Sequence, residues 1–217
     1  MVHAYIVPEN IDNRIIKQGI NILSGGGLVA FPTDTSWAIS CSFKSPAGIK
    51  KLRHISGERD ERHFTLLCNS ISQVSELCPI NNSEYRFLKK MVPGPYLFLL
   101  KTFNGAEKIL GLRRPIVGVR IPNHPVPICL IETLKEPLYS ITAKRSMLVH
   151  NKKEISDPLG IIEEDLFEDG WELEAIPGLD MLMDPSKTQE RLFSTILDCT
   201  GEEIILLRQG AGSYGSV

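Results

Sequence analysis

Short apolar runs separated by polar turns recur along the whole chain, and they predict a fold built from strands and helices. Runs bounded by Gly, Pro, Asp or Asn are too short for helices and are typical of buried strands. They cover 3–7, 28–31, 37–41, 64–68, 96–101, 117–121, 138–141, 179–183, 194–198 and 204–208. Apolar residues at helical spacing predict helices at 12–23, 46–55, 72–77, 84–92 and 125–134.

The order of these elements predicts an α/β protein with a single domain. Strands interleaved with helices favour a sheet that is covered by helices. Two stretches, 28–41 and 194–208, contain strands without an intervening helix, which indicates a mixed rather than a purely parallel sheet. We expect the domain to cover 1–210, with 211–217 as a short, poorly packed tail and no additional C-terminal domain.

Polar residues next to the apolar segments predict where helices begin. Ser45 before a proline is expected to cap the helix 46–55, and Ser83 to cap the helix 84–92. Residues 144–178 are more polar, so we expect an excursion of helix and loop there.

Composition narrows the class of protein. The chain has 217 residues, of which 42% are hydrophobic, enough for a substantial core. The net charge of −2 argues against a surface that is wholly a nucleic-acid-binding field, but it leaves a local basic cleft open. The cysteines form no CxxC pair and are expected to be reduced core residues. No apolar run is long enough to span a membrane and no signal peptide is evident, so we expect a cytoplasmic protein.

A polar corner between two apolar runs is the first candidate for chemistry. Pro32-Thr33-Asp34-Thr35 places two hydroxyl groups and a carboxylate at the end of the strand 28–31. Small polar groups at strand ends are where α/β proteins place ligand contacts. Asp and Thr also stabilise ordinary turns, so a purely structural corner is the alternative.

Basic residues at the ends of apolar runs are the second candidate. Arg120 lies inside the apolar run 117–121, where a guanidinium is costly to bury without an anion. Its planar fork suits a carboxylate or phosphate ligand, and an internal salt bridge is the alternative. The same two interpretations apply to Arg208, whereas Lys144 and Arg145 are expected on the solvated surface.

The common catalytic and metal motifs are absent from the sequence. It contains no nucleophile elbow, Walker A loop, zinc pattern or GxGxxG. The histidines show no metal-ligand spacing, and no catalytic triad is indicated. We therefore expect no structural metal site, and no catalytic triad can be assembled from this spacing.

Six short motifs follow one another along nearly the whole chain. They are PTDT at 32–35, PGP at 93–95, VRIPNHP at 119–125, PLYSITA at 137–143, STILD at 194–198 and LRQGA at 207–211. Together they resemble the YrdC/YciO family of threonylcarbamoyl-adenylate synthases, and the YciO branch in particular. The resemblance implies a twisted mixed sheet with covering helices around a large concave pocket.

The resemblance also implies an activity and assigns side chains to it. The family joins L-threonine, bicarbonate and ATP, with Mg²⁺ on the phosphates, into threonylcarbamoyl-AMP for tRNA modification. By position, the implied amino-acid contacts are Thr35, Arg120 and Ser140. The implied nucleotide contacts are Arg53, Thr142 and Arg208. Positioning and charge neutralisation carry such a reaction, so no residue is assigned as catalytic.

The sequence departs from the family pattern at three positions expected in the pocket. Ile55 stands at a basic position, Cys68 at the position of a threonine-contacting histidine, and Lys144 at that of an asparagine. Basic residues nearby are candidates to substitute for the missing groups: Arg59, Arg62 and Lys144.

These departures leave a second function open. It is a YciO-type paralogue that binds tRNA or double-stranded RNA without making an adenylate. Basic clusters at 50–53, 113–114 and 144–145 are the residues expected to line the RNA groove, with an affinity that falls as salt rises.

Overall fold

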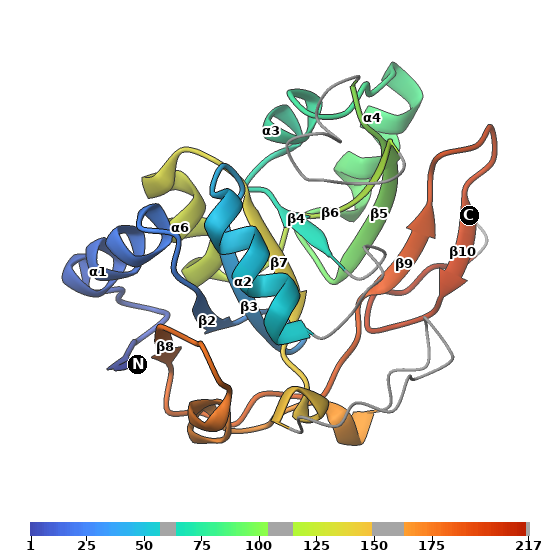
Figure 1. Cartoon of the computed structure of the whole chain (residues 1–217). Helices are drawn as coiled ribbons and strands as arrows, with labels where there is room; N and C mark the ends of the chain where they lie inside the picture. Colours follow the sequence, from blue (N-terminus) through green and yellow to red (C-terminus); the bar gives the residue numbers. More distant parts are fainter. Residues whose placement is uncertain (57–63, 104–114, 149–162, 216–217) are drawn as a thin grey trace.

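The computed structural model describes residues 1–56, 64–103, 115–148 and 163–215, and these form one mixed sheet with covering helices (Figure 1). Its ten strands are arranged in the order β1-β8-β2-β3-β7-β4-β6-β5-β9-β10. Parallel neighbours are β1–β8, β2–β8, β4–β6 and β5–β9, and the other neighbours are antiparallel. The predicted mixed α/β sheet is confirmed.

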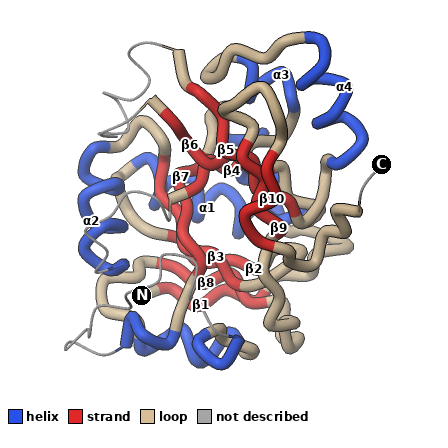
Figure 2. The backbone as a smooth tube through the Cα atoms, turned by 90° about the vertical axis from the view of Figure 1, so that its right-hand side faces the viewer, coloured by secondary structure: helices blue, strands red, loops and turns tan. Residues whose placement is uncertain are grey.

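Every predicted strand is present, with ends that differ by at most two residues. The strands are β1 (Val2–Tyr5), β2 (Val29–Pro32), β3 (Trp37–Ser42), β4 (Thr65–Leu67), β5 (Tyr96–Lys101), β6 (Ile116–Arg120), β7 (Leu138–Thr142), β8 (Met181–Asp184), β9 (Thr195–Asp198) and β10 (Ile205–Arg208). Figure 2 shows that they follow a strongly twisted path, so that β9 and β10 turn away from the plane of β1 and β8.

The helices also lie where the apolar spacing predicts them. They are α1 (Asn13–Ser24), α2 (Pro46–Ser56), α3 (Ile71–Ser75), α4 (Asn82–Met91) and α6 (Pro125–Leu134). The described part of the polar excursion holds only short 3₁₀ helices, at Arg145–Leu148, Glu163–Asp165 and Gly170–Ala175.

Side-chain caps fix the helix starts, and one of them differs from the prediction. Ser45 Oγ accepts the Gly48 N–H at 3.1 Å, as expected for the start of α2. In α4 the cap is Asn81 rather than Ser83, because Asn81 Oδ1 accepts the N–H groups of Ser83 and Glu84 at 2.8 and 2.9 Å. Glu84 Oε2 in turn accepts the Asn81 N–H at 2.7 Å, which completes a reciprocal capping box and leaves Ser83 inside the first turn.

Two apolar cores lie on the two faces of the sheet, because residues alternate between them along β2 and β3. Val29 and Phe31 join one core with residues of α1 and α6, whereas Ala30 and Ile39 join the other with residues of α2. The side chains of these four residues are fully buried or nearly so. The central strands are thus covered on both faces.

The segment after β10 packs more closely than predicted. Ala211 donates its N–H to the Phe193 carbonyl at 2.8 Å, and the Thr195 hydroxyl donates to the Gly212 carbonyl at 2.5 Å. A Cβ atom at Gly212 would lie 2.4 Å from the Tyr96 ring, so only glycine permits this approach. The expected poorly packed tail is therefore wrong for residues 211–214, because small residues let the backbone lie against β5 and β9.

Candidate functional site

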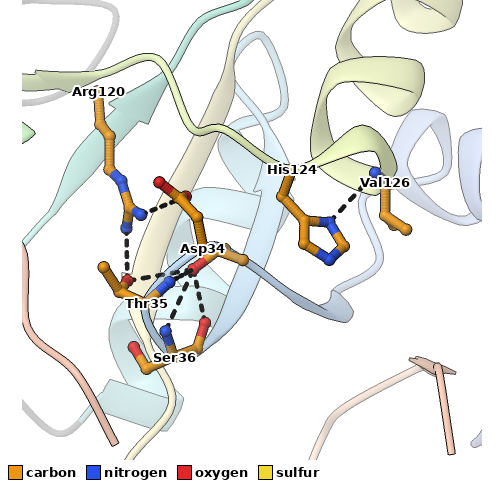
Figure 3. Close-up of polar contacts among 7 residues, drawn as sticks. Asp34, Thr35, Ser36, Arg120, His124 and Val126 are labelled. Atoms are coloured by element: carbon orange, nitrogen blue, oxygen red, sulfur yellow. Dashed lines mark hydrogen bonds and ion pairs between the residues drawn. The ribbon is translucent and has the colours of Figure 1, made fainter. Parts of the chain in front are cut away.

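The polar corner between β2 and β3 is both a structural turn and part of a site. The Thr33 hydroxyl donates to the Ser36 carbonyl at 2.7 Å and accepts the N–H groups of Thr35 and Ser36 at 3.2 and 3.3 Å. These bonds fold the corner and leave Asp34 and Thr35 pointing toward Arg120 (Figure 3). The Thr33 side chain therefore forms the structural turn, whereas Asp34 and Thr35 belong to the candidate site.

Arg120 lies at the end of β6 and reaches the corner across the twisted sheet. Its side chain is buried, with 7% of the residue exposed. Nη1 donates to Thr35 Oγ1 at 2.9 Å, and Nη2 donates to Asp34 Oδ1 at 2.5 Å (Figure 3). Burial lowers the pKa of Arg120 and the Asp34 charge opposes that shift. The internal salt bridge weighed for Arg120 is present, and Thr35 and Arg120 are brought together as predicted.

Two atoms of this ion pair have no partner of their own. Arg120 Nε and Asp34 Oδ2 are buried, and neither makes a hydrogen bond with any described residue. Buried polar atoms are nearly always paired in folded proteins, so such exceptions indicate strain, water or a ligand site. The sequence singled out the corner but did not identify Asp34 as the partner of Arg120. The only available signal was its position in PTDT.

His124 lies beside the corner and caps α6. Its Nδ1 accepts the Val126 N–H at 3.3 Å, so in the neutral ring the proton is on Nε2. Burial lowers the pKa of His124, and the Asp34 charge opposes this shift. The imidazole is therefore a neutral group next to the ion pair. It was not predicted, although it stands in the VRIPNHP motif.

A cavity of about 490 Å³ opens next to His124. It lies where the parallel strands β4 and β6 end, which is a common position for ligands in α/β sheets. It is lined by Asn69, Ser70, Ile71, Val92, Pro93, Ile121, Pro122, Asn123, His124, Pro125 and Ile128. The residues predicted to contact ligands are not among these, so this cavity adjoins the predicted pocket and does not coincide with it.

The two hydroxyl residues predicted on β7 have different environments. Ser140 is buried. Its hydroxyl accepts a hydrogen bond from the Ser40 hydroxyl at 2.8 Å and donates one to the Ile39 carbonyl at 3.4 Å. Its hydrogen bonds therefore lie within the sheet and not with Arg120. Thr142 ends β7 opposite Ala38 and is partly exposed.

The predicted nucleotide-contacting arginines come from elements far apart in the sheet order. Arg53 lies on α2, with its guanidinium 6.0 Å from the centre of the Phe64 ring. Arg208 ends β10, where Nε and Nη2 donate to the Ser194 carbonyl at 3.2 and 2.9 Å and the Phe193 ring lies 5.0 Å away. Burial lowers the pKa of Arg208. No carboxylate pairs with Arg208 in the described parts of the chain, so the salt-bridge alternative fails for it.

One short segment connects Arg208 with the corner. Leu192 donates its N–H to the Thr35 carbonyl at 3.3 Å, and Ser194, two residues later, holds Arg208. Arg59 and Arg62, the possible substitutes in the pocket, lie outside the described residues, as does the 113–114 cluster.

The other basic residues make more contacts within the protein than the sequence suggested. Lys144 is buried, with 7% exposed, and forms an isolated bridge with Leu166. Arg145 forms an ion pair with Glu172 and lies 5.3 Å from the Phe167 ring. The expectation of a solvated surface is wrong for Lys144, because the described part of the excursion folds back over it. The Arg145 side chain is still 34% exposed, so the expectation holds in part for it. Lys51 lies 3.5 Å from Asp180, so several cations proposed for an RNA groove already have partners.

The replaced family positions are core residues. Cys68 is fully buried and donates its N–H to the Arg120 carbonyl at 2.9 Å, and burial raises the pKa of its thiol. Ile55 is also buried.

All five cysteines are free, as predicted. Within the described ranges, no three His, Cys, Asp or Glu side chains form a metal-binding group, and no helix could cross a membrane.

The sequence of the chain is similar to those of known proteins. The pattern of the Sua5/YciO/YrdC family, described as telomere recombination, matches residues 21–210. The uncharacterized protein YciO of Escherichia coli is 30% identical over 209 residues, covering 96% of this chain and 95% of its own. A threonylcarbamoyl-AMP synthase of Nitrosococcus oceani is 29% identical over 135 residues, covering 62% and 73% respectively.

Solved structures agree on the fold. The crystal structure of E. coli YciO matches with a TM-score of 0.82 and 26% identity, covering 98% of both chains. Sua5 of P. abyssi, crystallised with L-threonine, matches with a TM-score of 0.79 and 22% identity, covering 97% of this chain and 58% of its own. With its PTDT corner, its buried Arg120 and these relatives, the chain belongs to the Sua5/YciO/YrdC family.

Proposed function

We propose that this protein is a nucleotidyltransferase that condenses L-threonine, bicarbonate and MgATP into threonylcarbamoyl-AMP and pyrophosphate. One observation carries the proposal: Arg120 is buried at a strand end and is oriented by two neighbouring side chains of the PTDT corner. Relatives with the same family pattern are threonylcarbamoyl-AMP synthases, and one related structure holds L-threonine.

In this proposal the corner and Arg120 form the amino-acid end of the site. Thr35 fixes the guanidinium through Nη1, and the guanidinium binds the threonine carboxylate. Holding the amino acid in one orientation lowers the barrier because its amine then faces the carbon that it attacks.

Arg208, Arg53 and Thr142 form the nucleotide end. Burial against the Phe193 ring keeps Arg208 in a setting of low polarity, where its charge acts strongly on phosphate oxygens. Mg²⁺ enters as part of the MgATP substrate and neutralises the phosphate charge. The substitutions at Ile55 and Cys68 remove two polar groups from the family pattern, so we expect a slower reaction than that of relatives that retain them.

The experiment measures pyrophosphate release by the full chain with MgATP. We expect release that requires both threonine and bicarbonate, and that disappears in Arg120→Ala. Arg14→Ala is the matched control, because Arg14 is exposed and its ion pair is with Asp12, two residues away. Folded protein that releases no pyrophosphate above background contradicts the proposal.

A further inference from the structure

The two edge strands of the sheet differ in how well they resist pairing with a further strand. Figure 2 shows β1 at one end of the sheet and β10, beyond β9, at the other. In β10 the register shifts between Leu206 and Arg208, and such an irregularity turns an edge away from further pairing. Strand β1 contains neither lysine nor proline and keeps a regular register with β8. It is therefore the edge that is open to another strand.

The open side of β1 carries the backbone groups of alternate residues. Val2 and Ile6 donate their N–H groups to carbonyls on the β8 side, each at 2.8 Å. Because backbone groups point to opposite sides in turn along a strand, His3 and Tyr5 direct their N–H and C=O groups away from β8. In the part of the chain that the structure describes, β1 has β8 as its one neighbour in the sheet. The edge thus offers donors and acceptors to an incoming strand.

The side chains on one face of β1 belong to an exposed aromatic surface. The centroids of the His3 and Tyr5 rings lie 4.7 Å apart. The His3 ring is fixed on both sides, by Glu174 Oε1 at 2.6 Å and Asp184 Oδ2 at 3.0 Å. Trp171 lies three residues before Glu174 on the same 3₁₀ helix, so both project from one side of it. Tyr5 and Trp171 are 67% and 66% exposed, and aromatic residues of this kind are enriched in protein interfaces.

We propose that β1 pairs with β1 of a second copy of this chain, antiparallel and across a twofold axis at Ala4. Residues that exchange hydrogen bonds in an antiparallel pair must both face the open edge. This register meets that condition, because it places His3 opposite Tyr5 of the second copy, and Tyr5 opposite His3. Ala4 lies opposite Ala4 of the second copy in a non-hydrogen-bonded pair, where the backbones are closest and a methyl group fits.

The exposed area at this edge is sufficient for a small dimer interface. A covered aromatic side chain buries roughly 150–250 Å², so Tyr5 and Trp171 together offer about 200–330 Å² per copy at their observed exposure. Met1 and Val7, at the two ends of the strand, are 55% and 58% exposed and add to this surface. Two copies thus approach the total of about 1,000 Å² that a specific interface needs. The Glu174 carboxylate beside the rings repels phosphate, which disfavours RNA as the occupant.

Sedimentation of the untagged full chain tests the assembly. The monomer has a mass of 24.2 kDa, and a species of twice that mass should grow as the concentration rises from roughly 1 to 100 μM. Tyr5→Lys should weaken dimerisation at least about 10-fold, because it removes the ring and adds a charge at the edge. Leu206→Lys is the matched control on the opposite edge, where Leu206 is 39% exposed, and it should leave the dimer unchanged.

A cysteine at the twofold axis tests the register. In Ala4→Cys the two copies should form a covalent dimer with oxidised glutathione, because Cα atoms of a non-hydrogen-bonded pair lie about 4.5 Å apart, within reach of a disulfide. Val2→Cys is the matched control, since Val2 lies opposite Ile6 in this register and should not form a cross-link. The wild-type chain, with its five free cysteines, measures the background from native thiols.

Several results would overturn the pairing. A wild-type chain that stays monomeric at about 100 μM leaves this edge to a different partner strand. An equal loss of the dimer in Leu206→Lys, or a series of larger species, indicates that β1 binds β10 of the next copy in an open array. A wild-type dimer without a cross-link in Ala4→Cys contradicts the twofold register. If Tyr5→Lys does not fold, the comparison of Ala4→Cys with Val2→Cys decides.

Discussion

The two ends of the proposed site are built in different ways. At the amino-acid end, Asp34, Thr35 and Arg120 meet in direct contacts of 2.5 and 2.9 Å. At the nucleotide end, Arg208 and Arg53 lie on elements that are far apart and make separate local contacts. The first end is a preformed cluster, whereas the second is a set of cations distributed around the sheet. Substitutions at the first should therefore affect stability and binding together, and those at the second mainly nucleotide use.

Arg120→Ala should have the largest effect. It leaves the Asp34 carboxylate buried without its partner, which costs about 3–5 kcal/mol of unfolding free energy. Denaturant unfolding measures this cost, and pyrophosphate release should fall to background. A loss of less than about 1 kcal/mol, the usual value of an exposed pair, would show that the cluster is not preformed.

Thr35→Val should weaken the amino-acid end without removing its charges. Valine matches threonine in shape but cannot accept the Nη1 hydrogen bond, and a bond to a charged group is worth about 1.5–3 kcal/mol. Threonine affinity should fall roughly 10- to 100-fold in calorimetry. Nucleotide affinity should stay unchanged, and an equal fall in both would contradict the separation of the two ends.

Arg208→Ala is the matching test at the other end. Arg208 is partly buried and donates to the Ser194 carbonyl, so we expect a stability loss of about 1 kcal/mol. The KM for MgATP should rise about 10-fold, which corresponds to one lost charge contact. Threonine affinity should be unaffected. If it falls as well, the Leu192 contact with Thr35 couples the ends more strongly than their geometry suggests.

His124, which lies beside the amino-acid end of the site, should make the free energy of unfolding depend slightly on pH. Its pKa is lowered from the ordinary 6.5 in the folded protein, so the unfolded chain binds more protons just below that value. Its contribution to stability is complete above pH 6.5 and is lost as the pH falls from there through the folded pKa. Unfolding curves should show a steeper acid loss for wild type than for His124→Asn, which keeps a helix cap. An equal loss of stability at acid pH in wild type and His124→Asn would show that other groups cause it.

The sequence predicted the elements well because their apolar periods are local properties. Helix α1 and the strands β2 and β3 follow directly from spacing and from the residues that bound them. Motif order also placed Thr35 and Arg120 in one site. These two residues are separated in the sheet order by β3, β7 and β4, and periodicity does not describe the twist that joins them.

The remaining features depend on contacts that no local pattern encodes. Asp34 becomes a site residue only because Arg120 reaches it, and His124 only because α6 begins beside the corner. Lys144 is polar in sequence yet buried, because the 3₁₀ segments of the excursion cover it. The hydroxyl of Ser140 bonds to its neighbour Ser40, a pairing fixed by the register of β3 and β7.

The close approach of the chain end to Tyr96 has a practical consequence for where the protein can be cut. The family pattern ends at residue 210, but the Gly212 carbonyl accepts bonds from both Thr195 and Gln209. A chain trimmed at that boundary loses these acceptors at the start of β9, directly after the segment that joins Arg208 to the corner. The minimal folded unit therefore extends beyond the recognisable motif, and a tag belongs after residue 215 or at the opposite terminus.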